Sequence, residues 1–92
     1  MSEEQSVSFV GFIMSLATTA AVHFGDLDDP VSGDRQTNLD AARQMIEIIA
    51  MLQEKTRGNL SADEDRLLEA LLYDLRMRFV DASKDRPRII TP

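Results

Sequence analysis

The single histidine and its acidic neighbour are the residues of this sequence best suited to chemistry. His23 precedes Asp26 by three positions. An imidazole beside a carboxylate can move a proton or respond to pH. It can also complement the negative end of a helix dipole, a role that needs no further partner. General bases and metal ligands do need such partners, so we interpret His23 as a helix-end residue.

The acidic stretch at residues 26–37, DLDDPVSGDRQT, is the second candidate. An EF-hand calcium loop carries acids at alternate positions, glycine at the sixth and glutamate at the twelfth. Counted from Asp26, those two positions hold Val31 and Thr37. The stretch therefore predicts a solvated acidic turn, and we expect neither a metal ion nor another cofactor.

Catalytic constellations are not recognisable elsewhere in the sequence. Cysteine is absent, which excludes disulfides, zinc fingers and thiol catalysis. There is no glycine-rich phosphate loop, GxSxG or HExxH pattern. The acids at 63–65 fit the start of a helix, where negative charge is favourable. We therefore expect a protein that is not an enzyme, with no catalytic residues.

Length and charge narrow the class of protein. Ninety-two residues make one small domain, and a net charge of −6 argues against nucleic-acid binding, which needs a basic stripe. The acidic start, MSEEQ, lacks the basic region of a signal peptide, so we expect a cytoplasmic protein.

Residues 55–79, KTRGNLSADEDRLLEALLYDLRMRF, predict a helical hairpin. A helix over 39–57, with Asn38 as N-cap, is closed by Gly58. Ser61 and Glu64 form a capping box that opens a helix over 62–82. Because the connection is short, these two helices are predicted to pack antiparallel.

The segment before the acidic loop predicts another helix, over 7–24, ended by Gly25. It has no charged residue apart from neutral His23, which raises the alternative of a membrane helix. Its small polar residues and the lack of flanking lysine or arginine argue against a membrane span. The domain thus spans 7–82 with a loop at 25–38, between a disordered 1–6 and an irregular tail at 83–92.

Apolar side chains cover more of these helices than a three-helix monomer can bury. The helix at 7–24 is apolar around well over half its circumference, and its small residues recur at every fourth position. The helix at 62–82 carries a second apolar stripe. We therefore predict a homodimer, with a higher oligomer as the alternative, whose interface comprises Gly11, Phe12, Ser15, Thr19, Tyr73, Met77 and Val80.

Arg76 and Arg78 make the end of the last helix basic. Cations near a helix C-terminus ordinarily complement its dipole. The functional alternative is that they dock an acidic partner, such as the acidic loop of a neighbouring copy or an unidentified protein.

The sequence also resembles a known family. The segments SLAT at 15–18, HFG at 23–25, KTRGNL at 55–60 and LRMRFV at 75–80 carry the likeness, which covers residues 9–80. They are similar to a family of short bacterial helical proteins catalogued as a domain of unknown function, number eighteen forty-four. The resemblance implies an all-helical bacterial cytoplasmic protein and brings no reaction, ligand or catalytic residue.

The sequence as a whole favours an all-α fold of three helices that assembles into a helical bundle oligomer. The favoured function is a non-catalytic, self-associating interaction module. Two alternatives stay open: a membrane-peripheral or membrane-anchored adaptor acting through the uncharged first helix, and a ligand-binding or enzymatic site formed between subunits.

Overall fold

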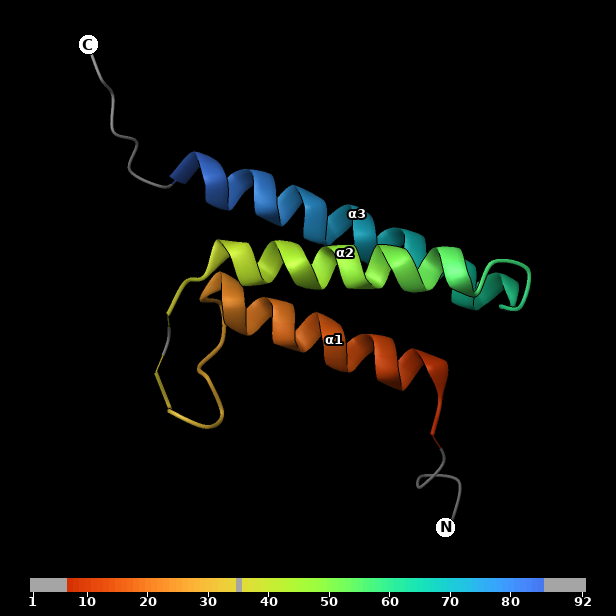
Figure 1. The fold of residues 1–92 in the computed structure, drawn as a ribbon, viewed down its shortest axis with the longest axis horizontal. Coiled ribbons are helices and arrows are strands. Elements are labelled where there is room, and N and C mark those ends of the chain that lie inside the picture. The colour runs from red at the N-terminus through yellow and green to blue at the C-terminus, as the bar shows by residue number, and fades with distance from the viewer. Residues whose placement is uncertain (1–6, 35, 86–92) are drawn as a thin grey trace.

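The protein consists of three α-helices in the computed structural model, which describes residues 7–34 and 36–85 (Figure 1). The helices are α1 (Phe9–Phe24), α2 (Leu39–Lys55) and α3 (Ala62–Asp85), and the described residues contain no strand. The all-α prediction is therefore confirmed. The predicted disorder of 1–6 and most of the predicted tail, from 86 onward, lie outside the described residues.

Local hydrogen bonds set both ends of α1. The Ser8 Oγ accepts the Gly11 N–H at 2.9 Å, so Ser8 is the N-cap and the helix begins two residues after the predicted start at 7. At the other end Gly25 has a φ of 85°, and its N–H donates to the Val22 carbonyl. The left-handed conformation that the sequence indicated at Gly25 thus closes α1.

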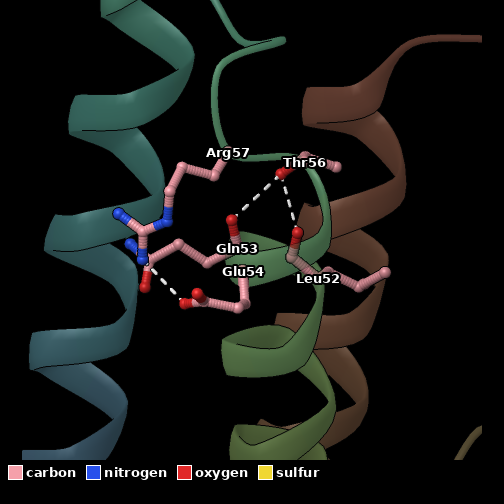
Figure 2. Close-up of polar contacts among 5 residues, drawn as sticks. All are labelled: Leu52, Gln53, Glu54, Thr56 and Arg57. Carbon is pink, nitrogen blue, oxygen red and sulfur yellow. Dashed lines mark hydrogen bonds and ion pairs between the residues drawn. The ribbon is translucent and has the colours of Figure 1, made fainter.

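The start of α2 follows the prediction, whereas its end comes earlier. Asn38 Oδ1 accepts the Ala41 N–H at 3.1 Å, as expected of an N-cap. The helix ends at Lys55, two residues before the predicted 57, because Thr56 closes its last turn. The Thr56 hydroxyl donates to the Leu52 carbonyl oxygen at 2.7 Å and lies 3.4 Å from the Gln53 carbonyl oxygen (Figure 2).

The turn after α2 is completed by an ion pair and a glycine. Arg57 donates to the Glu54 carboxylate at 2.7 Å (Figure 2), and this hydrogen bond, with the guanidinium charge, lowers the pKa of Glu54. Gly58 has a φ of 87°, the left-handed region that glycine enters freely. The glycine signal in the sequence was therefore correct, although the residue lies in the turn rather than at the first position after the helix.

A capping box opens α3. The Ser61 N–H donates to Glu64 Oε1 at 2.8 Å, and the Glu64 N–H donates to Ser61 Oγ at 3.1 Å. Two donors that the helix itself leaves unpaired are thereby satisfied. The acids at 63–65 lie in the first turn, at the positive end of the dipole. The sequence prediction for this helix start is confirmed.

Replacing the cap gives a direct test of its contribution. Ser61→Ala removes the acceptor for the Glu64 N–H and is expected to lower the free energy of unfolding by about 1 kcal/mol. Ser61→Gly is expected to lower the free energy of unfolding by only about a few tenths of a kcal/mol, because glycine is tolerated at N-caps. Urea denaturation of both variants measures the difference. Equal, negligible losses would contradict the role of Ser61 as N-cap.

The last helix is longer than predicted and runs to Asp85, three residues past 82. Ser83 and Lys84 are compatible with a helix, and Lys84 places a cation in the last turn, where the dipole favours it. After residue 82, the first residue that breaks a helix is Pro87. The boundary expected at 82 was therefore too early.

The three helices contact one another in every pairing and enclose one core. In Figure 1, α2 lies between α1 and α3, so within one chain the central helix is α2, although α1 has the wider apolar arc in the sequence. Eleven described apolar residues from the three helices are buried: Ile13, Ala20, Phe24, Leu39, Ala42, Ile46, Ile49, Leu68, Leu72, Leu75 and Ala82. The exposed residues of the candidate surfaces described below lie outside this core, although Ile46 also lines one of them.

Candidate self-association surface

The outer side of α1 carries the predicted strip of small residues. Gly11, Ser15 and Thr19 are all exposed. The Ser15 hydroxyl donates to the Phe12 carbonyl at 2.7 Å, and that of Thr19 donates to the Ser15 carbonyl at 3.1 Å. Both hydroxyls are therefore satisfied within the helix, which leaves a low, weakly polar surface for close approach by another helix.

Large apolar side chains border this strip on α1. Phe12 is 49% exposed, an unusually large fraction for an aromatic side chain with no polar atom. Val10 and Met14 are also exposed. Only Ile13, Ala20 and Phe24 of this helix are buried. Within one chain, α2 and α3 therefore cover only a narrow side of α1. Because the apolar arc of α1 is wider than this side, part of it stays exposed.

A second exposed apolar patch lies on α3. Tyr73, Met77 and Val80 follow one another at spacings of four and three and are exposed by 64%, 43% and 41%. They occupy the side of the helix opposite Leu68 and Leu75, which are buried. The structure places this stripe and the α1 strip on different helices, both outside the core, so the predicted interface residues form two patches.

Three of the other exposed apolar residues are also of interest, and the sequence analysis did not single them out. Ile48 and Met51 lie on the solvent side of α2, and Val31, in the acidic loop, is 94% exposed. Ile48 belongs to the wide apolar side of its helix, so the sequence alone does not tell whether it or Ile49 is buried. The valine could have been noticed as the one apolar side chain, apart from proline, in the segment 28–34, which otherwise consists of acids, serine and glycine.

Between α2 and α3 there is an apolar groove with charged side chains at its edge. Its volume is about 350 Å³. Ile46 is buried at its base, and Phe79 and Ala50 are partly buried beside it. Arg43 and Glu47 pair with each other at 2.9 Å. The lining residues are Arg43, Ile46, Glu47, Ala50, Arg76, Phe79 and Val80.

The two arginines proposed for docking have different surroundings. The Arg78 guanidinium donates to both Asp26 oxygens, at 2.9 and 2.6 Å, and lies 5.1 Å from the centroid of the Phe24 ring. It therefore ties α3 to the end of α1 within one chain. Arg76 is exposed and forms no ion pair with another described side chain. Of the two, Arg76 is the one available to a partner.

His23 lies half-buried in the last turn of α1, at a position where a cation complements the helix dipole. Its carbonyl accepts the Asn38 N–H at 2.7 Å. The imidazole borders a polar pocket of about 190 Å³ formed with the loop, to which Asp29 and Asp34 also contribute. Within 7–34 and 36–85, no three histidine, cysteine or acidic residues are grouped so that they could hold a metal ion.

The described helices also bear on the alternative of a membrane anchor. None of them combines the length and the apolar character needed to cross a bilayer. For α1, its 16 residues extend about 24 Å at ~1.5 Å per residue, which is less than the ~30 Å hydrocarbon core.

Comparison with known proteins places the chain in a family. No curated protein and no solved structure matches it. A family model described as a domain of unknown function, DUF1844, matches residues 6–81, which include α1, α2 and most of α3. The matched region contains the α1 strip, the α3 patch, the groove and the acidic loop. This chain is therefore a member of the DUF1844 family.

Proposed function

We propose that the protein is a non-catalytic helical module of the bacterial cytoplasm that associates with its own copies, as a homodimer in the simplest case. The observation that carries the proposal is the exposed strip on α1, where Gly11, Ser15 and Thr19 lie beside a half-exposed Phe12. Apolar area left in water is unfavourable by about 25 cal/mol per Å². Pairing of two such strips would remove this area from water.

The residues of the strip suit a two-fold contact. In a two-fold dimer the same patch meets itself, so one strip supplies both halves of the interface. Small side chains at every fourth position allow two helix backbones to approach closely, a geometry best known in membranes. Phe12 would then pack at the edge of the contact and exclude water from it.

The rest of the fold supports the strip. We take α2 and α3 to form an antiparallel hairpin, in line with the short turn between them and their side-by-side position in Figure 1. α1 packs on this hairpin through Ile13, Ala20 and Phe24. The exposed stripe on α3, at Tyr73, Met77 and Val80, offers a second surface through which a dimer could extend to a higher oligomer.

The test is the mass of the protein in solution, with and without a charge in the strip. Sedimentation equilibrium of the wild-type chain is expected to show a dimer at micromolar concentration. Ser15→Arg is expected to lower the association constant by about a hundredfold or more, because the two-fold brings two like charges together. The fold should be retained, since Ser15 is exposed.

Asn59→Arg is the control, because it adds the same charge at an exposed position in the turn between α2 and α3. It is expected to associate as the wild type does. Circular dichroism establishes that both variants are helical. A wild-type protein that sediments as a monomer at high micromolar concentration would refute the proposal.

A further inference from the structure

The exposed valine of the acidic loop and the groove between α2 and α3 are complementary in apolar character and in charge. Val31 is 94% exposed, so its side chain has almost no contact within its own chain. The groove has an apolar base, formed in part by Ile46 and Phe79, and no described side chain fills its roughly 350 Å³. Each feature supplies what the other lacks, namely an apolar side chain and an apolar site for it.

The loop presents Val31 on an ordered turn. The Asp29 N–H donates to the Asp34 carbonyl, and the Gly33 N–H donates to the Asp29 carbonyl, both at 2.7 Å. Asp29 Oδ1 also accepts the Val31 N–H at 2.8 Å. Figure 1 shows the loop extending from the bundle where α1 ends and α2 begins. A side chain held on such a turn loses little conformational entropy on binding.

Charge also favours this pairing. Asp29 and Asp34 lie on either side of Val31 in the sequence. At the edge of the groove, the Arg43 charge is balanced by Glu47, whereas Arg76 has no ion-pair partner among the described side chains. The net charge of the edge is therefore positive, opposite to that of the loop. Such complementarity orients partners and disfavours alternative ones.

We propose that the loop at 29–34 of one copy docks into the α2–α3 groove of a second copy, with Val31 on the apolar base and the loop carboxylates facing Arg76. The occupant is a second copy because the chain's own Val31 lies in solvent. Two copies related by a two-fold axis exchange one loop in each direction. This inference rests on the proposed self-association and adds a contact separate from the α1 strip.

Two variants at opposite sides of the contact test it. Val31→Asp removes the apolar anchor, and Arg76→Glu reverses the charge at the groove. Each is expected to lower the association constant by about tenfold or more. Val7→Asp is the control for the first, because Val7 is 96% exposed and lies outside the loop. Arg57→Glu is the control for the second, because Arg57 is exposed in the turn after α2 and does not line the groove.

Mixing the two variants provides the decisive measurement. An equimolar mixture of Val31→Asp and Arg76→Glu contains one intact loop and one intact groove for each unlike pair. Either substitution alone disrupts a loop–groove contact, so a variant paired with itself keeps neither of the two contacts, whereas a mixed pair keeps one. Labelled chains are therefore expected to form a heterodimer more tightly than either variant pairs with itself. Circular dichroism and thermal melts of each variant verify that the helices are intact.

The results separate this inference from the proposed function. If both variants associate like the wild type, or if only Arg76→Glu weakens association, the loop is not the occupant and the inference is overturned while self-association stands. A mixture that behaves as the sum of its components also overturns it. A monomeric wild type removes self-association itself, and with it both proposals.

Discussion

Ile49→Ala is expected to lower the free energy of unfolding by about 2–5 kcal/mol, the range for truncating a large buried aliphatic side chain. Ile49 has no exposed surface and lies in α2, the helix between the other two in Figure 1. The substitution removes methyl groups and leaves a cavity that three contacting helices cannot collapse without losing other contacts. A small domain is stabilised by only ~5–15 kcal/mol, so this loss is a large fraction of the total.

Its neighbour provides a matched control. Ile48 is the same residue type one position earlier on the same helix and is 39% exposed. Ile48→Ala carries the same change in helix propensity and should cost well under half as much, because the side chain already contacts water. Urea denaturation at one fixed protein concentration compares the two, since association would otherwise add to the apparent stability. Similar losses for both variants would mean that α2 is rotated relative to the core described above.

Gly25→Ala is expected to cost about 2 kcal/mol or more, from two separate causes. The φ of 85° lies in the left-handed region, which costs roughly 1–2 kcal/mol for a residue with a Cβ. In addition, a Cβ at this position would lie 2.7 Å from the Thr37 Oγ, closer than such atoms approach one another. Thr37 donates from that oxygen to the Phe24 carbonyl at 3.4 Å, so moving it away would weaken the end of α1.

Two other glycines separate these causes. Gly33 and Gly58 have φ values of 78° and 87°, and a Cβ on either would meet no atom within 4 Å. Gly33→Ala and Gly58→Ala should therefore show only the backbone cost. Thermal or urea unfolding of the three variants is expected to rank Gly25→Ala as the most damaging. Three equal losses would show that the contact with Thr37 relaxes freely.

The helix ends illustrate what could be predicted and where prediction stopped. Ser61 with Glu64, Asn38 and Gly25 were all identified correctly, because each acts through hydrogen bonds to residues within four positions. The end of α2 was placed two residues late, because Thr56 competes for carbonyls of its own last turn. Hydroxyl side chains adopt this geometry in only some contexts, so composition alone does not indicate it.

The candidate surfaces could be predicted from the sequence only in part. The sequence identified the small-residue strip on α1 and the second stripe on α3, since both follow from helical periodicity. It did not indicate that Arg78 bonds Asp26, a residue 52 positions away, nor that the α2–α3 groove borders Arg76. Such contacts depend on the relative placement of helices, which no local pattern specifies.

The sequence by itself thus determined three helices, their caps and the excess of apolar surface, because these properties arise from interactions along a single helix. Only the tertiary structure decided how that surface is divided between core and solvent. Ile49 is buried whereas Ile48 and Val31 are exposed, because burial depends on which neighbouring helix covers each side chain. The same packing gives two arginines of one helix different surroundings: Arg78 forms an ion pair with Asp26, whereas Arg76 faces solvent.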